Sequence, residues 1–65
     1  MPWDINNYPN SLKNLHRITR KKAIEIANAM IEEGYSEGRA IPIAIEQAKK
    51  WHQNATKEEI DSFDQ

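Results

Sequence analysis

Two helical patterns follow one another in TRKKAIEIANAMIEEGYSEGRAIPIAIEQAKKWHQ, residues 19–53. The first covers about residues 20–33, where neither Gly nor Pro interrupts the run; Thr19 is a candidate N-cap and Gly34 a candidate left-handed residue closing the helix. At 100° per residue, one arc collects the apolar residues Ala23, Ile24, Ile26, Ala27, Met30 and Ile31. The opposite side collects the polar residues Lys21, Lys22, Glu25, Asn28, Glu32 and Glu33, of which Lys21 and Glu25 have ion-pair spacing.

The second pattern predicts a helix over about residues 39–53. Proline lacks an N–H and clashes with the preceding turn, so we expect Pro42 in the first turn and a start between Arg39 and Ile41. One face carries Ala40, Ile41, Ala44, Ile45, Ala48 and Trp51. Ile43 falls on the polar side beside Pro42 and Lys50, and Glu46 is spaced to pair with Lys50.

The remaining segments complete a small domain. Residues 34–38 read as a tight turn, with Tyr35 folding back on the helix end. Residues 1–18 are irregular and are expected to lie over the two helices through apolar anchors, with one short helical turn ending near Leu15; the anchors are Trp3, Ile5, Tyr8, Leu12, Leu15 and Ile18. Thr56 and Glu59 have capping-box spacing, which predicts a short C-terminal helix over about residues 57–63, docked by Ile60 and Phe63 and followed by two frayed residues.

These elements predict an all-α fold, a single helical domain over residues 1–65 in which the two main helices pack as an antiparallel or steeply crossed pair. With 65 residues, 29% of them charged, and a net charge of −1, the chain has the composition of a small globular protein. It holds no cysteine, and we find no signal peptide and no apolar run long enough to span a membrane. A cytoplasmic location is the expectation.

The residues that would support catalysis are not arranged for it. His16 and His52 are far apart in the sequence, without carboxylates at metal-ligand spacing, so we read His16 as a surface residue and His52 as bordering the core near Trp51. Four of the five serines and threonines sit where a cap or turn favours a hydroxyl, and the fifth, Ser62, lies in the acidic tail without a histidine base nearby. The two glycines form no phosphate-binding loop. We therefore predict no enzyme, no cofactor, no metal site and no small-molecule substrate.

The charge distribution offers one candidate surface. Five cations and no acid lie between residues 13 and 22, whereas the segment after residue 53 is acidic. The basic stretch could be solvated, pair with the acidic tail, hold nucleic-acid phosphates or bind an acidic partner. Positive charge at a helix N-terminus opposes the macrodipole, which hints at another use for these cations. Its residues are Lys13, Arg17, Arg20, Lys21 and Lys22.

A second candidate surface is the outward face of the second helix, with Arg39, Ile43 and Lys50. We expect Trp3 or Tyr8 to cover Pro42 and Ile43, because large aromatic side chains supply much of the buried area in so small a domain. If Pro42 and Ile43 are uncovered, they form a small apolar patch suited to a partner or a homodimer.

Several strings in the sequence carry a resemblance to a known family. They are the opening MPW, YPNSLKN at residues 8–14, RKKAI at 20–24, IANAMI at 26–31 and EGYSEGRAIPIA at 33–44, with Ala48, Lys49 and Trp51. Together they make the chain resemble the YdaT-like family of small uncharacterised bacterial proteins. The Met-Pro-aromatic start and the Pro-x-Ser-x-Lys segment are also loosely similar to the ChaB family, described as cation-transport regulators.

The YdaT-like resemblance implies a cytoplasmic protein of bacterial or phage origin, associated with stress, and transfers no catalytic residue. Our prediction is a non-enzymatic helical module that acts by binding another protein and has an interaction or regulatory role. The alternative is nucleic-acid binding through residues 13–22.

Overall fold

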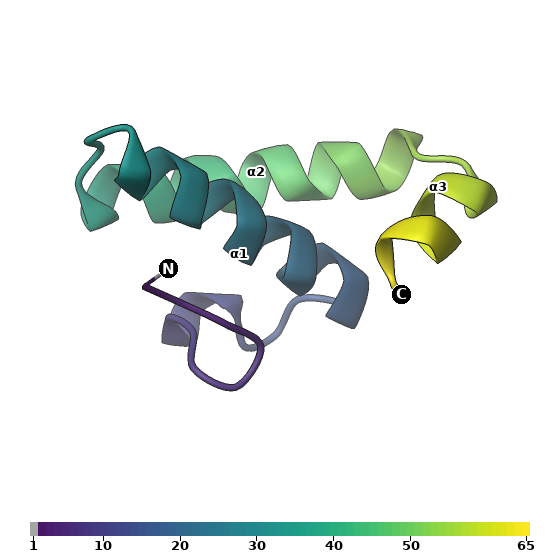
Figure 1. Ribbon diagram of the computed structural model, residues 1–65, viewed down its shortest axis with the longest axis horizontal. Helices are drawn as coiled ribbons and strands as arrows, with labels where there is room; N and C mark the ends of the chain where they lie inside the picture. The colour runs from purple at the N-terminus through teal and green to yellow at the C-terminus, as the bar shows by residue number, and fades with distance from the viewer. Residues whose placement is uncertain (1) are drawn as a thin grey trace.

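The computed structural model describes residues 2–65, which form three α-helices, one short 3₁₀ helix and no strand (Figure 1). Along the chain these are η1 (Asn10–Leu12), α1 (Arg17–Glu32), α2 (Glu37–Asn54) and α3 (Lys57–Phe63). The predicted all-α class, with two main helices and a short C-terminal helix, is confirmed.

The two long helices lie side by side and antiparallel, the N-terminal segment lies along α1, and α3 lies at the end of the pair where α1 begins and α2 ends (Figure 1). Their contact is built from alanines whose small side chains let the helices approach closely: Ala23 and Ala27 on α1, and Ala40, Ala44 and Ala48 on α2, all buried. Around them Leu12, Ile18 and Ile24 are also buried, and six larger, partly buried side chains pack against the core. Apolar burial of this kind supplies most of the driving force for folding.

Helix α1 begins at Arg17, three residues before the predicted start. His16 precedes it in extended conformation, and its Nδ1 accepts a hydrogen bond from the backbone N–H of Ile18 at 3.2 Å. The imidazole therefore satisfies one of the amides that a helix start leaves unpaired. Thr19, the predicted cap, is instead buried inside the first turn.

Helix α2 also begins earlier than predicted, at Glu37, after the N-cap Ser36. Pro42 thus lies inside the helix, and its expected place in the first turn is wrong. The carbonyl that Pro42 cannot bond is that of Gly38, four residues earlier. Both residues are exposed, so water can satisfy this carbonyl and the helix continues past the proline.

Gly34 closes α1 as predicted, with a φ of 102°. The N–H of Gly34 donates to the carbonyl of Ile31, and the N–H of Tyr35 donates to that of Met30, each at 3.0 Å. These two bonds define a Schellman motif, in which a left-handed residue allows the last carbonyls of a helix to find donors. The connection places Tyr35 at the surface, where 43% of the residue is exposed.

The N-terminal segment lies along α1, as expected (Figure 1). Trp3, Tyr8 and Leu15 are half-buried against the core, and a single 3₁₀ turn precedes Leu15. The predicted anchoring role of Ile5 is wrong, because Ile5 lies at the tip of a tight turn between Asp4 and Asn7 and is 66% exposed.

Helix α3 covers the predicted residues and carries the predicted capping box. Glu59 N donates to Thr56 Oγ1 at 3.1 Å, and Thr56 N donates to Glu59 Oε1 at 2.9 Å. The hydrogen bond that Thr56 N donates to the Glu59 carboxylate holds the pKa of Glu59 below its usual range. Ile60 and Phe63 are half-buried, which matches their predicted docking role.

Candidate functional site

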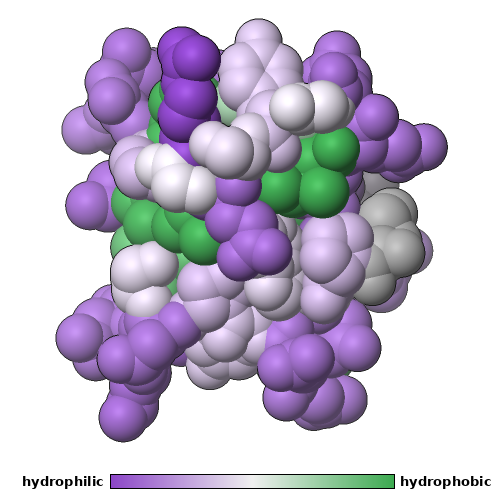
Figure 2. Space-filling view, turned by 90° about the vertical axis from the view of Figure 1, so that its left-hand side faces the viewer, coloured by the Kyte–Doolittle hydropathy of each residue, from purple (hydrophilic) through white to green (hydrophobic). Residues whose placement is uncertain are grey.

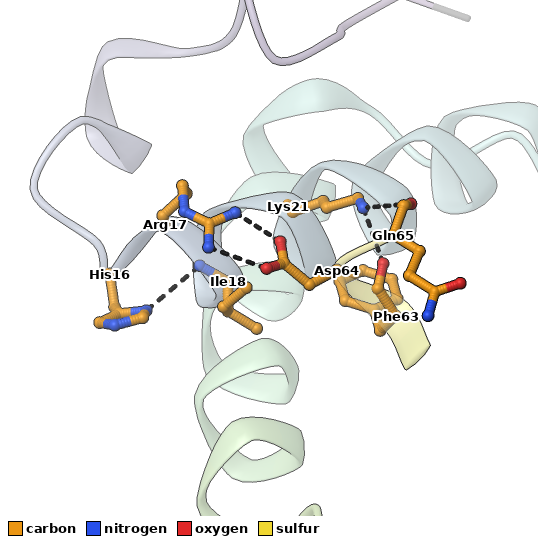
Figure 3. Close-up of polar contacts among 7 residues, drawn as sticks. All are labelled: His16, Arg17, Ile18, Lys21, Phe63, Asp64 and Gln65. Carbon is orange, nitrogen blue, oxygen red and sulfur yellow. Dashed lines mark hydrogen bonds and ion pairs between the residues drawn. The ribbon is translucent and has the colours of Figure 1, made fainter. Parts of the chain in front are cut away.

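The basic start of α1 holds the C-terminal residues of the chain (Figure 3). Both terminal nitrogens of the Arg17 guanidinium bond the carboxylate of Asp64, the Nη2–Oδ2 distance being 2.9 Å. Lys21 Nζ donates to the carbonyl of Phe63 at 2.7 Å and to that of Gln65 at 3.4 Å. The expected fraying at residues 64 and 65 is therefore wrong for Asp64, which is tied to α1.

The Arg17–Asp64 pair also shifts the pKa values of both side chains. The hydrogen bonds from Arg17 hold the pKa of Asp64 below its usual range, and Asp64 in turn raises the pKa of Arg17. A carboxylate beside the first residue of α1 is favourable for the helix dipole and offsets the unfavourable cations there.

Aromatic rings complete the docking of α3. The Lys21 ammonium lies 4.9 Å from the Phe63 ring centre, and the Lys22 ammonium lies 4.9 Å from both the Phe63 and Trp51 rings. The rings of Trp51 and Phe63 meet edge to face at 4.9 Å. Lys22 also pairs with Glu25 at 3.0 Å, in place of the predicted Lys21–Glu25 pair. The lysine stems and aromatic rings thus form one contact between α1, α2 and α3.

Arg20 holds the N-terminal segment against α1. Its guanidinium donates to the carbonyls of Leu12 at 3.1 Å, Lys13 at 2.9 Å and Leu15 at 2.9 Å, and it lies 5.1 Å from the Tyr8 ring centre. It therefore fixes the irregular segment before α1. Lys13 itself is exposed.

Four of the five cations predicted as a binding surface thus have partners within the chain. Pairing with an acidic residue of the tail, one of the alternatives left open by the sequence, is present for Arg17 and Asp64, whereas Lys22 pairs with Glu25 within α1. The physical reason is the position of α3, which returns the chain's C-terminal residues to the start of α1 (Figure 1). The cations that oppose the α1 dipole are used to fasten the two ends of the chain.

The two histidines meet at this end of the molecule. Their ring centres are 5.0 Å apart; His16 is exposed, and His52 is half-buried with its ring 6.5 Å from that of Trp51, as predicted. His52 Nδ1 lies 2.9 Å from Thr19 Oγ1, which ties the end of α2 to the start of α1. Over residues 2–65, no group of three or more potential ligands is placed to hold a metal ion.

The three candidates on α2 are placed apart from the fastened cations. Arg39 is exposed and lines a hollow beside the α1–α2 connection, together with Tyr35. Lys50 lies 3.7 Å from Glu46, as its spacing predicted. Ile43 is half-buried, but Pro42 is exposed, so the expected cover of Pro42 is wrong because Trp3 and Tyr8 pack on the core instead.

A second hollow, which the sequence did not reveal, lies at the same end of the molecule. We call it the turn-end groove; its lining residues are Glu25, Ile26, Ala29, Met30, Glu33, Tyr35 and Gln47. Ile26 and Met30, which are half-buried, form its apolar floor, and the exposed Glu25 and Glu33 lie at its border. Viewed from this end, the molecule shows hydrophobic side chains reaching the surface among charged ones (Figure 2).

The helical pattern predicted Ile26 and Met30 as core residues, and the structure leaves both half-buried. From α2, Gln47 lines the same groove. Because Gln47 is polar, the contact between the buried alanines of α1 and α2 does not continue there. In the sequence both helices carry an apolar face of six residues, so no signal there indicates this groove.

Comparison with known proteins gives one informative similarity. The chain is 65% identical over 63 residues to the uncharacterised protein YdaT of Bacillus subtilis (strain 168). The predicted resemblance to a YdaT-like family is confirmed. The match covers 97% of this chain but 42% of YdaT, so the chain spans less than half the length of that relative. No protein-family model matches the chain, and no solved structure does.

The similarity leaves the function to be argued from the site, because YdaT is itself uncharacterised. The similarity to the ChaB family stays a prediction. Among residues 2–65, no helix has both the length and the apolar character needed to cross a membrane.

Proposed function

We propose that this chain is a non-enzymatic module that binds another protein through the turn-end groove. The observation that carries the proposal is an apolar floor open to solvent beside Tyr35. Ile26 and Met30 are half-buried, Ala29 is exposed, and 43% of Tyr35 remains accessible. Tyrosine and methionine are enriched where proteins meet, since each offers a large contact area that adapts to a partner.

The position of the groove strengthens this proposal. The cations at the start of α1 are occupied in holding the chain ends, so they offer a partner less than the sequence suggested. Of residues 2–65, neither the N-terminal segment nor α3 extends over the α1–α2 connection (Figure 1). A partner would therefore find its apolar contact at the connection.

The family resemblance suggests a cellular location and a role for this protein. It favours a bacterial cytoplasmic protein with a role in stress response, and a regulatory task carried out by binding. A chain without cysteine fits a reducing compartment, where thiol pairs contribute no structural disulfides.

Site-specific photocross-linking tests the proposal. A photoreactive phenylalanine replaces Ala29, which is exposed within the groove, and in a matched control it replaces Lys49, which is exposed on α2 outside it. After irradiation in a B. subtilis lysate, we expect a discrete protein adduct from position 29 and none from position 49. A second change, Tyr35→Asp, should remove the adduct. Equal labelling from both positions, or no adduct from position 29, contradicts the proposal.

A further inference from the structure

The border of the turn-end groove is acidic. Between residues 25 and 39 the chain carries four glutamates and a single arginine. Glu25 and Glu33 line the groove itself. Glu25 is paired with Lys22, whereas Glu33 forms no ion pair with any residue in the described part of the chain. At the edge of the apolar floor, Glu33 therefore carries a negative charge that no ion pair in the described part of the chain compensates.

The groove also has a direction and a length. Glu25 and Ala29 of α1 and its C-cap residue Glu33 follow one another at four-residue spacing, and at 1.5 Å per residue they span about 12 Å. That distance equals roughly two turns of a helix laid alongside. Helix-in-groove recognition uses apolar anchors at this spacing, with polar residues on both flanks of the anchor row.

We propose that the turn-end groove takes a basic amphipathic helix of a partner protein. This inference rests on the proposed function and specifies its ligand. Apolar side chains of the helix would cover Ile26, Met30 and Tyr35, and a flanking Lys or Arg side chain would face Glu33. Charge of opposite sign at the edge raises the rate of association and disfavours acidic partners.

The test is a titration of the ¹⁵N-labelled chain with three synthetic peptides. The first has leucines at i, i+3 and i+4 spacing and lysines elsewhere; the second replaces every lysine by glutamate; the third has the composition of the first with the leucines scattered around the helix. We expect only the first peptide to shift the amides of Ile26, Ala29, Met30 and Tyr35. The shifts should weaken as salt concentration rises.

Charge-reversal variants sharpen the result. Glu33→Lys should weaken binding of the first peptide about threefold, the scale of one exposed ion pair. Asp61→Lys makes the same charge change on the exposed surface of α3, at the other end of the molecule, and should leave binding unchanged. Equal weakening by both variants would mean a non-specific charge effect and would overturn the inference.

The remaining outcomes separate the inference from the proposed function. Binding of the glutamate peptide in the groove would overturn the basic ligand while leaving the groove as an interaction surface. Shifts of groove amides on raising the concentration of the chain alone would make the occupant a second copy and also overturn it. If no peptide shifts these amides, the inference fails, and the photocross-link at position 29 then decides the proposed function independently.

Discussion

Asn28 binds the backbone of Trp3 through both ends of its amide side chain. Asn28 Oδ1 accepts from Trp3 N at 3.2 Å, and Asn28 Nδ2 donates to Trp3 O at 2.9 Å. The sequence pattern placed Asn28 on the solvated side of α1, yet only 4% of it is exposed. A buried amide is costly unless it is hydrogen-bonded, and here the N-terminal segment supplies both partners.

We expect Asn28→Ala to lower the free energy of unfolding by about 1–3 kcal/mol, because the change leaves the N–H and carbonyl of Trp3 without their partners. Urea denaturation measures the loss. Asn54→Ala is the matched control, since the Asn54 amide bonds the carbonyl of Lys50 on an exposed surface. It should stay within about 0.5 kcal/mol of the native chain. Equal losses in both variants would contradict the role given to Asn28.

The two glycines predict effects of opposite sign. Gly34→Ala forces a side chain into the left-handed region at a φ of 102° and should destabilise by about 1 kcal/mol. Gly38→Ala should be neutral or stabilise by up to about 1 kcal/mol, because Gly38 lies in the first turn of α2 and nothing lies within 4 Å of an added Cβ. Thermal unfolding of the two variants measures both effects. Loss of stability in Gly38→Ala would contradict the assignment of α2 from Glu37.

If His16 stabilises the chain as the N-cap of α1, another capping residue at position 16 should preserve that stability. His16→Ala removes the acceptor for Ile18 N and should cost about 1 kcal/mol, whereas His16→Asn offers a preferred capping oxygen and should recover most of it. Denaturant midpoints compare the two variants. If asparagine loses as much as alanine, the contribution of His16 comes from its contact with the His52 ring instead of the cap.

The docking of α3 should weaken in acid. Because the pKa of Asp64 is lowered in the folded chain, its pairing with Arg17 stabilises fully above the unfolded-state pKa of about 4. That contribution is lost as pH falls through the lowered folded-state pKa. Carboxyl ¹³C shifts follow Asp64, and Arg17→Gln should move its pKa upward while Glu59 keeps its lowered value. An unchanged Asp64 titration in Arg17→Gln would contradict the pair.

Most cations of residues 13–22 are bonded within the chain, which disfavours the alternative that this stretch binds nucleic acid. Titration of the labelled chain with mixed DNA and RNA at low salt should leave the amides of residues 13–22 unshifted, because most of their cations already hold the chain ends. Shifts confined to these amides that collapse as salt rises would favour nucleic-acid binding over the proposed function.

Local signals in the sequence predicted the helices well. The capping box at Thr56 and the glycine closing α1 both act through bonds within a few residues, so the structure reproduces them. The starts of α1 and α2 were predicted too late for different reasons. Histidine is an uncommon N-cap, so His16 gives no clear start signal, and proline disfavours a helix interior, yet α2 tolerates Pro42 on its exposed side.

Long-range relationships were harder to foresee. The pairing of Arg17 with Asp64 depends on the path of α3, which charge alone left as one of several alternatives. Asn28 and Thr19 are polar residues buried by partners far away in the sequence, and helical periodicity carries no information on such partners. The turn-end groove arises where the apolar arc of α1 extends past the alanines of α2, which only the packed pair of helices reveals.

The central claim is that the turn-end groove binds a partner protein, and the photocross-link at position 29 tests it most directly. The account predicts a discrete protein adduct from position 29 that disappears in Tyr35→Asp, with none from position 49. An adduct that persists in Tyr35→Asp, or labelling that is equal at the two positions, would contradict it.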